Sequence, residues 1–161
     1  MKSTLDLSGL HKHKRRMKHL ESKTVEWGFL SGNHSTAEMS YAQLAATLEY
    51  GTRSSQGNWH IPPRPAFRTM IDRMKVAQRA FVMEVDSYLR DYMESDNKSP
   101  DLLLNKTGKY LQELHQDTMR DWVSTGSQYR NNARETIDQK GFNMPFVYSG
   151  ELINNVKYQI W

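Results

Sequence analysis

The sequence predicts a small α+β domain, in which a small mixed β-sheet made of N-terminal and C-terminal strands packs against two long helices. Two observations lead to this fold class. Apolar and polar residues alternate at 24–29 and again at 156–160, as they do in half-buried strands. Between these segments, apolar residues recur at helical spacing over 65–93 and 101–124. The simplest closure pairs the two terminal strands and places the helices on one face of the sheet.

The composition favours a protein that gains stability by assembling. The chain has 161 residues, which suits one domain with an arm. Its hydrophobic content of 37% and mean hydropathy of -0.79 are low for a self-sufficient globule. We therefore expect long solvated helices or stabilisation by neighbouring subunits.

The first element is a helix expected over residues 5–21, in a basic arm (1–23) that precedes the main domain (24–161). The arm holds seven lysines and arginines against Asp6 and Glu21, whereas acids slightly outnumber bases in the rest of the chain. The net charge of +4 therefore belongs to the arm.

The segment "HKHKRRMKH" at 11–19 permits two interpretations. It is either a solvated helix face or a surface that binds DNA phosphates or an acidic partner. In the second case we expect Arg15 and Arg16 to point away from the core of their own subunit. His11 and His13 are two residues apart, a spacing that does not suit a helical metal pair. The candidate contacts are Lys12, Lys14, Arg15, Arg16 and Lys18.

A helix expected over 40–50 ends at Gly51, and a polar protruding loop follows at 52–61. Pro62 and Pro63 then restrict the backbone, and Arg64 is pushed out of the helical region because Pro65 follows it. This pattern predicts a rigid elbow that sets the direction of the loop, with Arg64 held outward to bind a carboxylate or carbonyls at a subunit boundary.

The remaining elements follow in order. The long helices carry inner apolar faces, and "SDNKSP" at 95–100 separates them. A short helix is expected at 132–140 and another from Ser149, before the terminal strand. The apolar residues expected inside are Phe67, Met70, Ile71, Met74, Phe81, Val85, Tyr88, Leu89 and Tyr92 on the first long helix, and Leu103, Tyr110, Leu111, Leu114 and Trp122 on the second.

Two tryptophans stand outside these helical patterns. Trp59 lies in the polar loop, and Trp161 is the last residue given. Each is either an exposed interface anchor or folds back onto its own domain. The candidate interface residues are Trp59, Ile61, Pro62, Pro63, Arg64, Pro65 and Trp161.

Several kinds of chemistry are not expected. The chain has no cysteine, which removes disulfides and cysteine-ligated zinc. No serine lies in a hydrolase elbow, and no glycine-rich loop suits a phosphate. No apolar run is long enough to span a membrane, and the N-terminus does not resemble a secretory signal. We expect no enzymatic activity, no cofactor and no membrane partner.

Three segments in a fixed order resemble the tail-completion and neck proteins of tailed bacteriophages, the minor tail components of the lambda Z and Mu G type. The first is "EYGT" at 49–52, which ends a helix. The second is "IPPRPAF" at 61–67, which precedes a long helix. The third is "SGEL" at 149–152, which begins a helix before a strand. The resemblance covers residues 24–161.

The resemblance implies a structural virion protein, made in the bacterial host cytoplasm and located in the head-to-tail neck. Such a protein forms a homo-oligomeric ring, six-fold or twelve-fold, which completes the tail and joins it to the capsid connector. Its partners are its own copies, the adjacent connector, terminator and tail proteins, and the genomic DNA in the channel. The alternatives are an adjacent ring, such as a head-closure stopper or a tail terminator, and a DNA-binding regulatory module that uses the basic arm.

Overall fold

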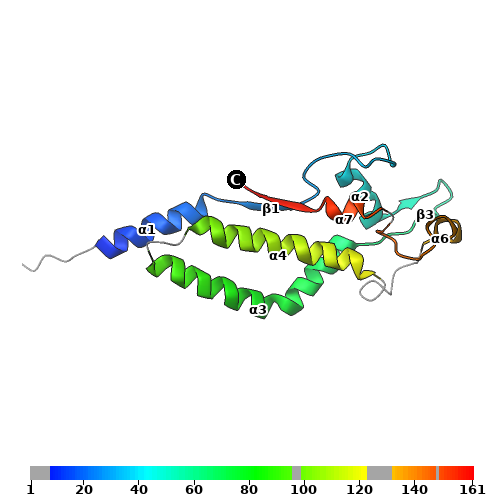
Figure 1. The fold of residues 1–161 in the computed structure, drawn as a ribbon. Coiled ribbons are helices and arrows are strands. Elements are labelled where there is room, and N and C mark those ends of the chain that lie inside the picture. Colours follow the sequence, from blue (N-terminus) through cyan, green and yellow to red (C-terminus); the bar gives the residue numbers. More distant parts are fainter. Residues whose placement is uncertain (1–7, 96–98, 123–131, 148) are drawn as a thin grey trace, which may run out of the picture.

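The computed structural model describes residues 8–95, 99–122, 132–147 and 149–161 as an elongated α+β subunit (Figure 1). One end carries α1, and the other carries a β-hairpin and α6. The elements, in chain order, are α1 (Ser8–Glu21), β1 (Val25–Gly28), α2 (Tyr41–Tyr50), β2 (Thr52–Arg53), β3 (Trp59–Ile61), α3 (Ala66–Glu94), α4 (Pro100–Arg120), α6 (Arg134–Lys140), α7 (Glu151–Asn154) and β4 (Lys157–Ile160).

The predicted α+β class and the pairing of the two terminal strands are confirmed. β1 and β4 form an antiparallel pair, with Val25 opposite Ile160 and Gly28 opposite Lys157. Within the described residues this sheet consists of β1 and β4, which run in opposite directions, so it is antiparallel rather than mixed. Both strands pack on α4. The ring of Tyr158 lies directly over Gly108 of α4, at a place where a side chain would not fit.

The long helices begin and end close to their predicted limits. Ser99 caps α4 by accepting a hydrogen bond from the Asp101 amide, and Pro100 occupies the first turn, where its missing N–H costs nothing. Ser40 and Gln43 form a reciprocal capping box at the start of α2. The start of the first expected helix at residue 5 and the end of the second long helix at 123–124 lie outside the described residues.

The interior consists of two small clusters rather than one core. One lies around α2, α7 and the end of α4, and contains Tyr41, Ala66, Met119, Trp122, Phe146, Leu152, Ile153 and Val156. The other lies near α1 and contains Tyr88, Tyr92 and Leu103, with Leu20 packed against it. Between them, residues 75–80 of α3 are all exposed. Met70 and Leu111 are buried outside these clusters, and the rings of Phe81 and Tyr110 stack, so a thin apolar layer between α3 and α4 joins the two ends.

Candidate assembly interface

The proline elbow is packed against the end of α2. The Arg64 amide donates to the Leu48 carbonyl at 2.6 Å. Gly51 has φ 69 and ψ 175, and a Cβ there would lie 2.5 Å from the Ile61 oxygen and 2.7 Å from the Pro63 nitrogen. The elbow and the last turn of α2 therefore touch backbone to backbone, which only glycine permits.

Glu49 joins this junction to the next helix. Its carboxylate accepts hydrogen bonds from the amides of Phe67 (2.9 Å) and Arg68 (3.3 Å) in the first turn of α3. Pro65 precedes this turn and provides no side-chain cap. A carboxylate from α2 thus satisfies donors that would otherwise be unpaired, and it complements the helix dipole.

Arg64 does not point outward, so that expectation was wrong. Arg64 is only 6% exposed, and burial lowers the pKa of its guanidinium group. Lys140 lies near enough that burial and then the Arg64 charge lower the pKa of its ammonium group. The Lys140 ammonium donates to the Val147 carbonyl at 2.9 Å. The backbone hydrogen bond from Arg64 to α2 fixes the elbow against that helix, and the Arg64 side chain is therefore buried.

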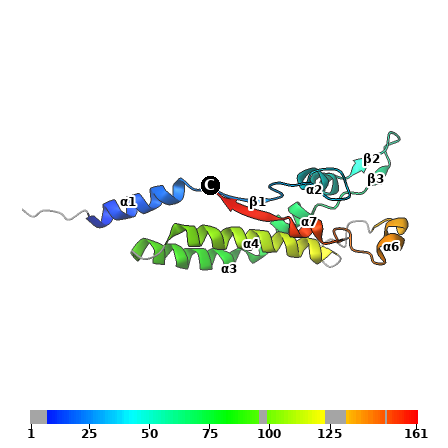
Figure 2. The same ribbon diagram turned by 45° about the horizontal axis from the view of Figure 1, so that its top comes forward.

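The loop at 52–61 is a short hairpin that projects from the end of the subunit (Figure 2). β2 and β3 pair, and the Ser54 amide donates to the Asn58 carbonyl at 2.8 Å near the tip. The Arg53 guanidinium lies 4.0 Å from the centre of the Trp59 ring. Trp59 is half-buried, so the structure favours the alternative in which it packs on its own hairpin.

The other predicted elbow residues are not freely exposed either. Pro65 is buried, whereas Ile61, Pro62 and Pro63 are half-buried. Ile61 lies opposite Thr52 in the hairpin. The elbow is therefore packed within its own subunit, at the base of the β2–β3 hairpin.

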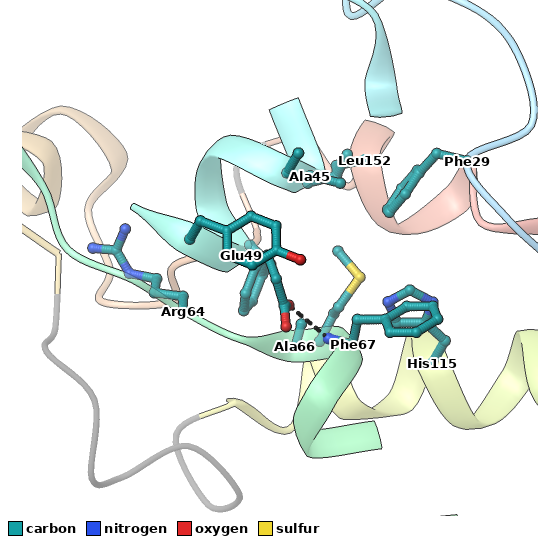
Figure 3. Close-up of a pocket in the computed structure, with 12 residues that line it drawn as sticks. Phe29, Ala45, Glu49, Arg64, Ala66, Phe67, His115 and Leu152 are labelled. Atoms are coloured by element: carbon teal, nitrogen blue, oxygen red, sulfur yellow. Dashed lines mark hydrogen bonds between the residues drawn. The ribbon is translucent and has the colours of Figure 1, made fainter. Parts of the chain in front are cut away.

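An apolar pocket of about 190 Å³ lies beside the proline elbow (Figure 3). Phe29, Phe67 and His115 gather on one side, and Arg64 lies on the opposite side. The pocket is larger than the roughly 150 Å³ cavity that holds benzene in a well-studied engineered core. It can accept an apolar side chain or a small apolar molecule.

His115 is a second buried polar residue of this pocket, besides Arg64. It is 2% exposed, and its Nδ1 has no hydrogen-bond partner among the described residues. The rings of Phe29 and Phe67 meet it edge-on at 5.8 and 5.4 Å. Burial lowers the pKa of His115 to about 4, so the imidazole is neutral at pH 7.

Glu151 fastens the start of α7 to the loop before α2. Its carboxylate accepts hydrogen bonds from the Tyr41 hydroxyl (2.6 Å), the Ser35 amide (2.9 Å) and the Ser35 hydroxyl (2.6 Å). These bonds, those of Ser35 foremost, lower the pKa of Glu151 to about 2. Because a carboxylate with a pKa of about 2 is a weak base, the arrangement resembles a structural clasp more than an activated nucleophile.

Trp161 is exposed, in agreement with one of its two predicted alternatives. It is 65% exposed, and its Nε1 donates to Glu26 at 3.0 Å. Hydrogen bonds from Gln159 and then Trp161 lower the pKa of Glu26. The ring therefore lies on the surface at the α1 end of the sheet, far along the strand from the pocket.

The basic arm divides into two faces. Arg16 donates to the carbonyls of Tyr92 (2.6 Å), Met93 (2.7 Å) and Ser95 (2.6 Å), so it binds the C-terminal end of α3 in its own subunit. The expectation that Arg16 faces a partner was wrong, because the unpaired carbonyls and negative dipole end of α3 attract it. Lys12 is half-buried, whereas the predicted Lys14, Arg15 and Lys18 are exposed.

The described residues offer few other kinds of site. Within them, no group of three or more histidine, aspartate and glutamate side chains is arranged to hold a metal ion. Nor is any helix in this part of the chain both long and apolar enough to cross a bilayer. Scans against protein-family models, curated proteins and solved structures found no match to this chain.

Glu49 and Glu151 lie in segments that carry the resemblance, but the sequence does not show which distant residues they contact. Glu49 caps a helix 18 residues away, and Glu151 reaches a loop 116 residues away. The buried His115 shows no pattern that distinguishes it from a solvated histidine on a helix. Gly51 had a recognisable signal, since a glycine after a helix marks its end.

Proposed function

We propose that this chain is a structural subunit of the neck of a tailed bacteriophage, which forms a homo-oligomeric ring between the capsid connector and the tail. The observation that carries the proposal is the meeting of three separate motif segments around α2. Glu49 and Gly51 contact the elbow at 61–67, and Glu151 of the third segment binds Tyr41 at the start of α2. Segments that are far apart in sequence thus form one connected unit.

The shape of the subunit also supports an assembly role. Large apolar side chains are exposed along its length, including Val76 (88%), Met83 (65%) and Leu10 (63%). Its interior is split into two small clusters. Such a subunit gains stability when neighbours cover its surface, as ring assembly would do. The projecting hairpin provides a natural contact with an adjacent ring.

Deletion of the gene in the phage or prophage that carries it tests this proposal. We expect filled heads and separate tails to accumulate, and infectivity to return when the wild-type chain is supplied from a plasmid. A complementing variant substituted outside the proposed contacts, Gln139→Ala on the exposed surface of α6, should restore infectivity equally and controls for expression. Normal, joined particles from the deletion strain would refute a neck role.

A further inference from the structure

We infer that the outer face of α1 binds the groove between α3 and α4 of a second copy of this chain. The inference deepens the proposed function, on which it rests for the ring, by naming one subunit contact. The outer face is defined here by Leu10, Lys14, Met17 and Lys18. The groove is lined by Glu84, Ser87, Tyr88, Asp91, Leu102 and Lys106.

The inner face of α1 is already occupied by its own subunit. Arg16 binds the end of α3, and Leu20 packs against the cluster beside it. At 100° per residue and measured from Arg16, Lys14 lies at about 160°, opposite the inner face, whereas Leu10 and Met17 lie at about 120° and 100°, on the flank of the helix that is turned outward. The fold therefore holds this outer face away from its own subunit, and α1 extends past the ends of α3 and α4 in both views (Figures 1 and 2).

The outer face combines apolar and basic groups. Leu10 is 63% exposed and Met17 is 50% exposed, a large fraction for apolar side chains on a docked helix. Lys14 lies between them, and Lys18 lies one turn beyond it. DNA phosphates would use the two lysines but leave Leu10 and Met17 in water. A protein groove that is both acidic and apolar satisfies both kinds of side chain.

The groove has this character. Its volume is about 410 Å³, and Leu102 on its wall is 50% exposed. Glu84 and Asp91 lie seven residues apart on α3, so they are about 10.5 Å apart along the helix. Lys106 already pairs with Glu84 at 3.3 Å, with both side chains largely exposed. Such an exposed pair is weak and can be shared with an incoming lysine.

The two surfaces are of similar length. Leu10 and Met17 are also seven residues apart, with Lys14 between them. An α1 helix laid along the groove would place an apolar side chain against the exposed Leu102. Its two lysines are about 6 Å apart along the helix, and their long side chains would extend toward Glu84 and Asp91. Since the two surfaces differ, the contact is head-to-tail, the kind that generates a ring when its rotation closes.

Disulfide trapping tests this contact, because the chain contains no natural cysteine. We would mix full-length Met17→Cys and Leu102→Cys proteins under mild oxidation and measure the 17–102 disulfide. A mixture of Met17→Cys with Gln56→Cys, whose position lies on the exposed hairpin tip, is the matched control. We expect the 17–102 product to form faster than the control product. Circular dichroism of each variant establishes that it is folded.

Charge reversal then tests the ion pairs. Adding Lys14→Glu and Lys18→Glu to the Met17→Cys protein should slow trapping by about tenfold at low salt, since two exposed ion pairs are lost. Adding Glu84→Lys to the Leu102→Cys protein should restore part of the rate. Raising the salt concentration should slow the wild-type reaction, because these charges are exposed.

Three outcomes would overturn the inference. The first is a 17–102 product that forms no faster than the control, and the second is a preference for 17–17 products. The third is tight duplex DNA binding that the Lys14→Glu, Lys18→Glu protein loses, without any 17–102 product. The trapping result is independent of the deletion phenotype. If the 17–102 disulfide forms but the deletion strain still makes joined particles, the neck role alone is refuted. If the deletion strain accumulates separate heads and tails but no 17–102 disulfide forms, this contact alone is refuted.

Discussion

Replacing Gly51 with alanine should destabilise the subunit strongly, because two costs coincide there. The backbone at φ 69 and ψ 175 lies in a region that is essentially restricted to glycine, which costs about 1–3 kcal/mol for another residue. The new Cβ would also lie 2.5 Å from the Ile61 oxygen and 2.7 Å from the Pro63 nitrogen. Both are backbone atoms, so neither can rotate away.

The second cost corresponds to overpacking, typically about 1–3 kcal/mol. We therefore expect Gly51→Ala to lower the free energy of unfolding by about 4 kcal/mol. Gly57→Ala is the matched control, since Gly57 also has a positive φ of 81 but a Cβ there meets nothing within 4 Å. It should cost only about 1–2 kcal/mol.

Urea unfolding followed by circular dichroism measures both variants. The difference between them isolates the contact between the elbow and α2 from the cost of a positive φ. Equal losses for Gly51→Ala and Gly57→Ala would show that the elbow is not pressed against α2, and would refute our account of the junction.

Three further predictions concern other parts of the subunit. Arg16→Ala should lower the unfolding free energy by about 2 kcal/mol in urea titrations, because three carbonyls lose a charged donor, whereas Arg15→Ala should change little. Gly108→Ala should lower the melting temperature because a ring from β4 covers that position, whereas Gly9→Ala, in open space within α1, should raise it slightly. His115 has a folded pKa of about 4, below its unfolded value of 6.5, so its neutral form favours folding above pH 6.5. As the pH falls from 6.5 to 4 we expect His115 to contribute a loss of about 3 kcal/mol, and His115→Phe should remove the slope above pH 5, where the carboxylates are still ionised.

Much of the secondary structure was predictable because its causes are local. The helical repeats over the two long helices, the Ser99–Pro100 start of α4 and the Gly51 stop of α2 all act within a few residues. The terminal strands were also predictable, since alternation marks a half-buried strand and only one partner was available. These elements determine the fold class.

The candidate interface was harder to predict because its contacts are between distant segments. Arg64 was expected outside because the prolines on both sides of it restrict the backbone, but its amide is bound to Leu48 and its side chain lies inside. Arg16 was expected outside for its charge, yet the end of α3 recruits it. In both cases the partner lies in another element, and no local pattern reports which element will be adjacent.

The hairpin at 52–61 is an intermediate case. Thr52 and Ile61 pair across a turn that includes Gly57, with its positive φ. The sequence shows a polar loop with a glycine, but β2 has only two residues, too few for alternation to be visible. Its short strands are stabilised by the Arg53–Trp59 contact, which local polarity does not reveal.

The most direct test of the neck proposal is electron cryo-microscopy of the intact phage particle that encodes this chain. We expect a closed ring of copies between the capsid connector and the tail, with each β2–β3 hairpin reaching an adjacent ring. Density for the chain in the capsid shell, the baseplate or the tail fibres, or its absence from the particle, would contradict the proposal.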